Sequence, residues 1–270
     1  MAERVAVVYF SQTGNTEKVA LAIARGLEAS GVKADLLRLE TTDPAVLRDY
    51  GFFGLGAPAF YFKLPFNVAW FLKAMPRMPG KFAFGFLTDG GHPGNAFREM
   101  TRRFACRGVT MADAFRCLGV DTYPPFIGTG RQAGHPDAAE LAAAETFGRG
   151  LVARRDRIRG GASELVPAFP RRFDRFAALG VFLTRPMVAL ISPIKHVNAA
   201  KCTRCGLCVK NCPTANIRLA PLAPSPSEGT PRFGWRCVYC YWCERACPER
   251  AIECDWRRMK RRLNRTHAGE

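Results

Sequence analysis

The chain reads KCTRCGLCVKNCP at residues 201–213 and RCVYCYWCERACP at residues 236–248. In each segment three cysteines are separated by two residues, and a fourth follows after three more residues, directly before a proline. The segments align at an offset of 35 residues, which also places Lys201 on Arg236 and Ile217 on Ile252. This part of the chain is therefore an internal repeat that carries eight cysteines at the spacing of sulfur ligands.

The cysteine spacing resembles the ligand run of bacterial two-cluster ferredoxins. In that family three closely spaced cysteines hold one iron-sulfur cluster, and the fourth, before the proline, reaches the other cluster. The resemblance implies two 4Fe-4S clusters with crossed ligand sets. The expected ligands are Cys202, Cys205, Cys208 and Cys247 for the first cluster, and Cys237, Cys240, Cys243 and Cys212 for the second.

Zinc sites and disulfides are weaker explanations of these cysteines. Eight cysteines could form two all-cysteine zinc sites, but zinc ribbons require neither the third cysteine at the short gap nor the Cys-Pro pair. A disulfide framework is disfavoured by the crowding of the cysteines and by the absence of a signal-peptide pattern, so we expect a cytoplasmic, reducing environment. Cys106, Cys117 and Cys254 have no partners at ligand spacing and are expected to be buried or half-buried free thiols.

The N-terminal part begins with the apolar run VAVVYF at residues 5–10, which predicts a buried strand. The hydroxyl-rich segment SQTGNT at residues 11–16 follows. A helix is expected from Glu17 to Glu28, with Val19, Ile23 and Leu27 on one face. Backbone N–H groups at such a helix start, together with the hydroxyls, can hold a phosphate without a cationic side chain. A P-loop is excluded because it would require Gly-Lys-Ser/Thr here.

The pattern S-x-T-G-N-T after the first strand resembles the FMN phosphate loop of flavodoxins. Further strands are expected near residues 32–39, 51–57, 82–87 and 114–120, alternating with helices near 66–75, 95–107 and 137–154. The resemblance implies an α/β fold: a flavodoxin-like, doubly wound, five-stranded parallel sheet of order 2-1-3-4-5, followed by a small α+β two-cluster ferredoxin domain. In such a sheet the ligand lies beyond the carboxyl ends of the central strands.

Two more loops are expected at that edge of the sheet. Residues 57–61 resemble the flavodoxin segment beside the isoalloxazine ring, with Phe60 or Tyr61 as candidates to stack on it, and the glycine-rich backbone of residues 88–95 permits close approach to a flat ring. His92 is either a pocket residue or a solvated loop histidine. The candidate FMN-binding residues are Ser11, Thr13, Gly14, Asn15, Thr16, Pro58, Ala59, Phe60, Tyr61, Thr88, Gly90, Gly91, His92, Gly94 and Asn95.

The segment GLGAPA at residues 54–59 has the letters of the dinucleotide-binding fingerprint G-x-G-x-x-A, but its context does not fit such a site. Pro58 and the aromatic run after it do not open a helix, and no acidic residue stands about 20 positions further on to bind a ribose. We therefore expect no NAD(P) site.

A flavodoxin-like domain joined to a two-cluster ferredoxin resembles the flavodoxin-ferredoxin fusions of anaerobic or facultatively anaerobic prokaryotes. The expected parts are a flavodoxin-like FMN-binding domain (1–155), a basic and apolar connecting segment (156–196), a ferredoxin domain (197–256) and a basic tail (257–270). The resemblance implies an electron-transfer protein that passes electrons between FMN and two 4Fe-4S clusters, to or from a partner oxidoreductase.

Two alternatives remain open at this point. One is a flavin-dependent reductase of a small organic substrate or quinone that uses the clusters as an internal electron wire. The other is a structural or membrane-docking protein in which one site has lost its cofactor. No catalytic arrangement of carboxylates, nucleophile and base stands out, so an electron carrier is favoured over a substrate-specific oxidoreductase.

The charge balance of 40 Lys+Arg against 23 Asp+Glu gives a net charge of +17. This predicts a redox partner with an acidic docking surface, or contact with an anionic membrane on the cytoplasmic face, whereas no nucleic-acid-binding signature accompanies the charge. A merely solvated basic surface is the alternative. The arginine-rich clusters are Arg154, Arg155, Arg157 and Arg159; Arg171, Arg172 and Arg175; and Arg257, Arg258, Lys260, Arg261, Arg262 and Arg265.

The segment from 160 to 197 turns apolar between Phe176 and Ile194. A membrane-spanning helix needs about 20 predominantly apolar residues, and the central Arg185 would cost about 2.5–3.5 kcal/mol in a bilayer. Pro186 and Pro193 also interrupt the run. We expect this segment to pack against the domains, with a position on a membrane surface as the alternative. The Pro/Ser stretch at 221–227 is predicted to be an extended surface loop.

Overall fold

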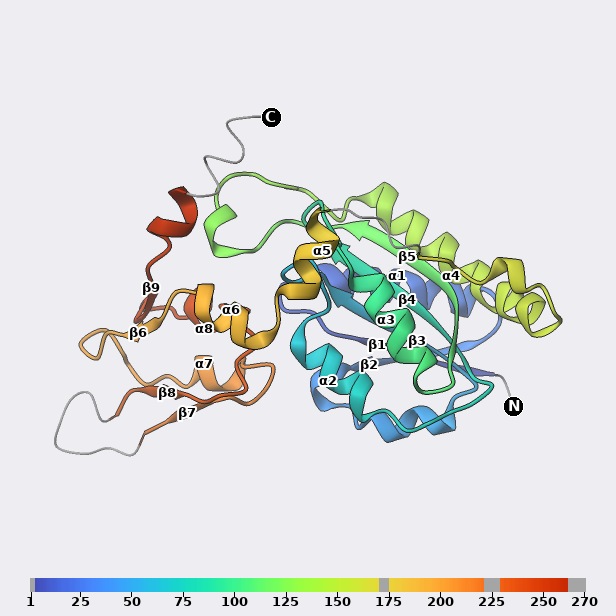
Figure 1. Ribbon diagram of the computed structural model, residues 1–270, viewed down its shortest axis with the longest axis horizontal. Helices are drawn as coiled ribbons and strands as arrows, with labels where there is room; N and C mark the ends of the chain where they lie inside the picture. Colours follow the sequence, from blue (N-terminus) through green and yellow to red (C-terminus); the bar gives the residue numbers. More distant parts are fainter. Residues whose placement is uncertain (1–2, 170–174, 221–228, 262–270) are drawn as a thin grey trace. The chain divides into compact units, whose positions relative to one another are not determined.

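The computed structural model describes residues 3–169, 175–220 and 229–261 (Figure 1). The chain divides into two compact units. The N-terminal unit comprises Met1–Asp121 and Gly130–Thr184, and the C-terminal unit comprises Thr122–Thr129 and Arg185–Glu270. The predicted loop at 221–227 and the arginines Arg171, Arg172, Arg262 and Arg265 lie outside the described residues.

A five-stranded parallel sheet forms the centre of the N-terminal unit (Figure 1). Its strands are β1 (Arg4–Tyr9), β2 (Lys33–Arg38), β3 (Phe52–Pro58), β4 (Phe82–Asp89) and β5 (Thr110–Leu118). Their order is β2-β1-β3-β4-β5, so the predicted topology is confirmed. The central strands β1, β3 and β4 are buried along almost their whole length. Burial on both faces explains why they are continuous apolar runs rather than alternating patterns.

Helices cover both faces of this sheet. On one face α1 (Asn15–Ala29) and α4 (Ala138–Arg159) contribute Ile23 and Leu151 to a buried core. On the other face α2 (Phe66–Ala74) and α3 (Ala96–Ala105) contribute Leu72 and Met100 to a second core. The unit also contains α5 (Arg175–Phe182) and 3-10 helices at Leu39–Thr41, Pro44–Asp49 and Ser163–Leu165.

Helices α1 and α4 approach each other closely at two glycines. A Cβ atom on Gly26 would collide with the carbonyl oxygen of Glu145, and one on Gly148 would collide with the carbonyl oxygen of Ile23. In both cases the obstacle is backbone, which cannot move aside as a side chain can. The absence of a Cβ at these positions therefore sets the distance between the two helices.

Strand β5 and helix α4 differ from their predicted limits. β5 begins at Thr110, four residues before the expected start, and α4 continues to Arg159. The early part of β5 contains Asp113, which breaks the apolar pattern because its carboxylate pairs with Arg154 of α4 at 3.2 Å. An edge strand tolerates such polar side chains, since it is less completely buried than the central strands.

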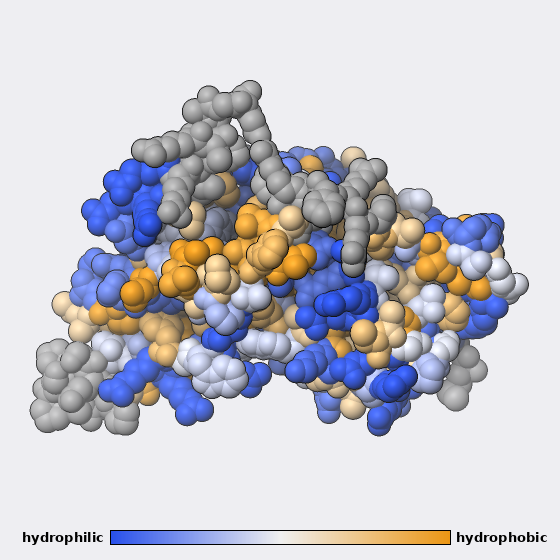
Figure 2. All heavy atoms as spheres, in the orientation of Figure 1, coloured by the Kyte–Doolittle hydropathy of each residue, from blue (hydrophilic) through white to orange (hydrophobic). Residues whose placement is uncertain are grey.

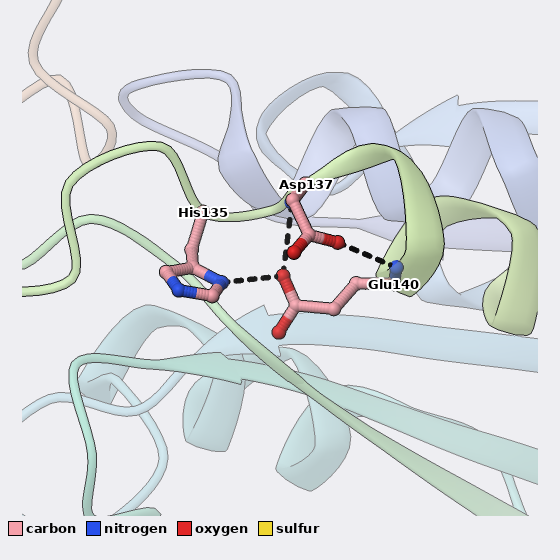
Figure 3. Close-up of side chains that lie close together, drawn as sticks. All are labelled: His135, Asp137 and Glu140. Atoms are coloured by element: carbon pink, nitrogen blue, oxygen red, sulfur yellow. Dashed lines mark hydrogen bonds and ion pairs between the residues drawn. The ribbon is translucent and has the colours of Figure 1, made fainter.

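The start of α4 is held by a capping box (Figure 3). Asp137 Oδ1 accepts from the Glu140 N–H at 2.8 Å, and Glu140 Oε2 accepts from the Asp137 N–H at 2.9 Å. The ring Nδ1 of His135 lies 2.7 Å from the same Glu140 oxygen, and Glu140 Oε1 accepts from the Leu118 N–H at 3.3 Å. The three side chains cluster as metal ligands can, but their hydrogen bonds satisfy the helix start and join it to the end of β5.

The C-terminal unit repeats one small motif. Helices α7 (Leu207–Lys210) and α8 (Trp242–Arg245) are related by the 35-residue offset of the sequence, as are strands β7 (Ile217–Leu219) and β9 (Ile252–Cys254). β7 pairs with β8 (Pro231–Phe233), and β9 pairs with β6 (Lys195–Val197), both antiparallel. The unit also contains α6 (Arg185–Ile191) and a 3-10 helix at Pro124–Phe126.

The apolar run from Phe176 to Ile194 forms two short helices, α5 and α6, rather than one long helix. The break falls at Leu183 and Thr184, just before Arg185 and Pro186. In the described ranges no helix is both long and apolar enough to cross a bilayer.

Substitution of Gly148 by Ala should destabilise the N-terminal unit. The added methyl meets the Ile23 carbonyl oxygen, and overpacking of this kind costs about 1–3 kcal/mol of the free energy of unfolding. Gly150→Ala, on the same helix with nothing within 4 Å of its added Cβ, is the matched control and should gain up to about 1 kcal/mol. Urea denaturation followed by far-UV circular dichroism measures both, and equal midpoints would contradict the close helix contact.

Candidate functional site

The eight repeat cysteines of the C-terminal unit line two pockets. One pocket is lined by Cys202, Cys205, Cys208 and Cys247. The other is lined by Cys212, Cys237, Cys240 and Cys243. Each pocket thus combines three cysteines of one half of the repeat with the fourth cysteine of the other half. These are the two sets expected from the sequence, and their role as ligands remains a prediction.

The loops around the pockets use the same unusual backbone conformations in both halves. Left-handed φ angles occur at Arg204 (57°), Gly206 (75°) and Ala215 (47°), and again 35 positions later at Tyr239 (56°), Tyr241 (55°) and Arg250 (49°). Non-glycine residues rarely adopt this conformation unless the surroundings enforce it. Its recurrence at every equivalent position indicates that both loops curl around the same kind of group.

Backbone N–H groups point at cysteine sulfurs in both pockets. The Ala251 N–H donates to Cys247 Sγ at 3.2 Å, and the equivalent Asn216 N–H donates to Cys212 Sγ at 3.3 Å. In the second pocket the Tyr239 N–H also donates to Cys237 Sγ at 3.4 Å. N–H donors of this kind stabilise negative charge on sulfur, so these pockets fit thiolate-held iron-sulfur clusters.

The three remaining cysteines lie outside these pockets. Cys117 is buried and Cys254 is half-buried, as expected, whereas Cys106 is exposed, so that expectation was wrong for Cys106. Burial, aided by the nearby charge of Glu140, raises the pKa of Cys117 to about 12. Cys117 is therefore a neutral core thiol.

The predicted phosphate loop of the N-terminal unit joins β1 to α1. Gly14 has a left-handed φ of 87° and leads into the first turn of α1, where no side chain caps the helix. The Oγ of Ser11 and the Nε2 of Gln12 are buried without a hydrogen-bond partner. Buried polar groups are normally satisfied, so these two atoms and the uncapped helix start fit a bound phosphate.

Thr16 and Arg38 connect this loop to its surroundings. The hydroxyl of Thr16 shares a 2.7 Å hydrogen bond with the hydroxyl of Thr88, the first residue of the predicted third loop. Arg38, at the end of β2, donates to the Ser11 carbonyl oxygen at 3.3 Å. Arg38 was not identified from the sequence, because only the parallel pairing of β1 and β2 brings it close to the phosphate loop.

The second loop forms a tight turn. Phe60 and Lys63 exchange backbone hydrogen bonds of 2.9 and 3.0 Å, with Tyr61 and Phe62 left-handed at the tip. Phe60 packs edge-on against the core residue Phe10, with ring centroids 6.1 Å apart, which favours a packing role for Phe60. Tyr61 is half-buried at the turn and is the stronger candidate to contact a ring.

The third loop is bonded to the second. The Asn95 N–H donates to the Phe62 carbonyl oxygen at 2.7 Å, and a Cβ on Gly94 would collide with that oxygen. His92 is exposed, and Thr88 is buried. Only glycine at position 94 lets these two loops approach each other, so they form one wall of the candidate site.

Two arginines that the sequence analysis missed fix the glycines of this loop. Arg116 of β5 forms two 2.8 Å bonds with the buried carboxylate of Asp89, which raise the pKa of its guanidinium, and a third with the Gly91 carbonyl oxygen. Arg131 donates to the Gly90 carbonyl oxygen at 3.1 Å. A lone arginine in the predicted strand near 114–120 was the available signal. It is Asp89 whose carboxylate is buried, 1% exposed, and a buried carboxylate requires a cationic partner.

Comparison with known proteins divides the chain in the same way. Residues 7–135 match the family described as flavodoxin, and residues 201–252 match the family described as a 4Fe-4S dicluster domain.

Two curated relatives are ferredoxin-type proteins. The methylamine utilization ferredoxin-type protein MauM of Paracoccus denitrificans is 33% identical over 129 residues, which cover 42% of this chain and 54% of the relative. The ferredoxin-type protein NapG of Escherichia coli is 42% identical over 102 residues, which cover 36% of this chain and 42% of the relative. The chain thus spans about half the length of the curated relatives it matches.

Two solved flavodoxins are similar to part of this chain. The flavodoxin of Megasphaera elsdenii is 25% identical and covers 53% of this chain and 98% of its own, with a TM-score of 0.41. Flavodoxin 1 of Bacillus cereus is 20% identical and covers 57% of this chain and 98% of its own, with a TM-score of 0.46.

Proposed function

Because this chain joins a flavodoxin domain to a 4Fe-4S dicluster domain, we propose that it carries electrons between FMN and two 4Fe-4S clusters, to or from a partner oxidoreductase. The observation that carries this proposal is the sorting of eight cysteines into two pockets of four. Bound FMN can exchange one or two electrons, whereas a 4Fe-4S cluster exchanges one, so their combination couples two-electron and one-electron partners.

The cysteine pockets are the proposed cluster sites. Cys202, Cys205, Cys208 and Cys247 would hold one cluster, and Cys237, Cys240, Cys243 and Cys212 the other. The contribution of the protein is to supply the thiolates, to stabilise their charge with N–H donors, and to surround them with apolar side chains such as Ile252 in one pocket and Phe233 in the other.

The three loops of the N-terminal unit are the proposed FMN site. The phosphate would bind at the start of α1, where Ser11 and the backbone N–H groups of residues 14–16 offer donors. The ring would lie against Tyr61 and the glycine-rich backbone of residues 88–95, which Arg116 and Arg131 hold in place. A preformed, rigid cradle supports cofactor retention because little ordering is required on binding.

The proposed docking surface for the redox partner is the exposed face of α6. Met187, Leu190 and Ile191 of α6 are 45%, 79% and 42% exposed, and Ile194, three residues beyond the end of the helix, is 75% exposed. Exposed apolar side chains gather on the surface of the molecule in Figure 2. Trp235 is 75% exposed, and the Arg185 guanidinium lies 5.8 Å from its ring centroid. An apolar centre beside basic residues in a chain of net charge +17 suits an acidic partner protein.

The position of α6 supports this choice. Arg185, at its first turn, donates to the Cys237 carbonyl oxygen at 3.2 Å. A partner docked on α6 would therefore lie next to the second cysteine pocket, which shortens the path for electrons. We further propose a cytoplasmic location, because the cysteines of this chain are free thiols and unpaired cysteines are typical of a reducing compartment.

Anaerobically purified protein should contain about eight irons, about eight sulfides and one FMN per chain. Stepwise reduction, monitored by visible absorbance and electron paramagnetic resonance, should reduce all three groups without added substrate. Cys212→Ser should alter the signal of the cluster assigned to Cys237, Cys240 and Cys243, whereas Cys106→Ser, at an exposed cysteine outside the pockets, should alter neither signal. Iron near zero would contradict the proposal, and turnover of a quinone at the flavin would favour a reductase instead.

Ser11→Ala should weaken FMN binding. Loss of one hydrogen bond to a charged phosphate costs about 1.5–3 kcal/mol, which corresponds to roughly a 10- to 100-fold higher Kd. Fluorescence titration of flavin-depleted protein with FMN measures the change, and iron content should stay constant. Ser163→Ala, at an exposed serine of the same unit, is the control. An unchanged Kd in Ser11→Ala would remove this hydroxyl from the phosphate site.

Negative charge introduced on α6 and just beyond its end should slow electron transfer to an acidic acceptor such as rubredoxin. We expect the double substitution Leu190→Glu and Ile194→Glu to lower the second-order rate constant, and the wild-type rate constant to fall with ionic strength. Leu21→Glu, at an exposed leucine of α1, is the control. If the substitutions leave the rate unchanged but abolish sedimentation with phosphatidylglycerol vesicles, α6 is a membrane contact instead.

A further inference from the structure

Lys195 brings a positive charge to one cysteine pocket. It is the first residue of β6, it lines the second pocket, and its Nζ donates to Cys237 Sγ at 3.6 Å. The ammonium also lies 4.7 Å from the ring centroid of Tyr241 and 5.2 Å from that of Tyr239. Aromatic faces attract cations, so these rings hold the ammonium beside the sulfur.

The internal repeat identifies the equivalent residue at the first pocket. Lys195 pairs with Cys254 across β6 and β9, and Pro231 pairs with Leu219 across β8 and β7. Cys254 and Leu219 are related by the 35-residue offset, so Lys195 and Pro231 occupy equivalent places, and Pro231 lines the first pocket. Proline offers neither a charge nor an N–H donor. The two pockets therefore differ in charge at this position.

Among the residues that the structure describes, the other charged side chains named at the pockets have different partners. Arg204 lines the first pocket, but its guanidinium donates to the carbonyl oxygens of Gly229 and Ala220, at 2.6 and 3.2 Å. Glu244, an acidic side chain of α8, accepts from the indole N–H of Trp256 at 3.0 Å. The contact between a cation and a cysteine sulfur thus distinguishes the second pocket.

We propose that Lys195 raises the reduction potential of the cluster held by Cys237, Cys240, Cys243 and Cys212 above that of its twin. The inference rests on the proposed function, because it requires a cluster in each pocket. Reduction adds one electron, taken from a low-potential donor, and therefore one negative charge. A nearby ammonium stabilises that charge, and charge and hydrogen bonds at the sulfurs are known determinants of cluster potential. An electron that enters the C-terminal unit therefore comes to rest on the second cluster.

This difference in potential predicts the direction of electron flow relative to the proposed docking surface. Arg185 of α6 is bonded to the Cys237 carbonyl oxygen, and Lys195 is bonded to the sulfur of the same residue. The cluster of higher potential is thus the one beside α6. Electrons collect where a partner docked on α6 would take them.

Potentiometric titration of the full-length protein, followed by electron paramagnetic resonance, tests the role of Lys195. Lys195→Met should lower the higher of the two cluster midpoints and leave the lower one in place, with the equilibrium constant for that reduction falling at least tenfold, or 59 mV for one electron. Lys195→Gln, which keeps a donor but removes the charge, should shift the same midpoint in the same direction. Lys195→Arg should restore it.

Controls separate this inference from the proposed function. Lys201→Met, at a lysine that is 51% exposed and paired with Glu253, should shift neither midpoint. Cys240→Ser marks the signal of the second cluster. Iron is counted first: wild-type protein without iron would refute the proposed function itself. Eight irons in Lys195→Gln with both midpoints unchanged, or a shift confined to the lower midpoint, would overturn the role of Lys195 while the proposed function stands.

Discussion

The exchange of one cysteine between the two halves of the repeat is the constraint on which the C-terminal unit depends. Cys247 completes the pocket of the first half, and Cys212 completes that of the second. Neither half can complete a pocket with its own cysteines alone. The two halves must therefore adopt the same succession of loop, helix and strand, 35 residues apart, so that each can supply its fourth cysteine to the other. The strands here are only three residues long and would contribute little stability by themselves. The cysteine pockets are therefore as much the core of this unit as its apolar residues are.

The N-terminal unit obtains its site by different means. Two apolar cores, one on each face of its sheet, hold this unit together, and buried polar groups without a partner occur in the loop after β1. The buried Ser11 hydroxyl has no partner, the start of α1 is uncapped, and two consecutive aromatic residues adopt left-handed conformations. Strain and unsatisfied polar groups concentrate at ligand sites because the rest of the fold can sustain them.

Charge gives each site its individual character. In the N-terminal unit, the pair of Arg116 with the buried Asp89 fixes a glycine-rich loop that would otherwise have many conformations. In the C-terminal unit, Lys195 breaks a symmetry that backbone and cysteines preserve. Repetition supplies two similar pockets, and the contact of Lys195 with a cysteine sulfur of one of them would make that pocket the preferred site for an electron. Arg185 of α6 is bonded to the Cys237 carbonyl oxygen, so the proposed docking surface would lie beside the pocket in which the electron is proposed to reside.

The amino-acid sequence alone determined the features that depend on local spacing. The sequence predicted the cysteine gaps, the 35-residue offset, the apolar strands and the loop after β1. It could do so because metal ligation, burial and helix starts impose short-range patterns. The start of β5 was placed too late, since Asp113 is paired with a residue on a distant helix. Arg38, Arg116, Arg131 and Lys195 acquire their roles only from strand pairing and from the approach of loops. Such contacts join residues far apart in the chain, and no short-range pattern records them; only the tertiary structure decided which cations stand beside each site.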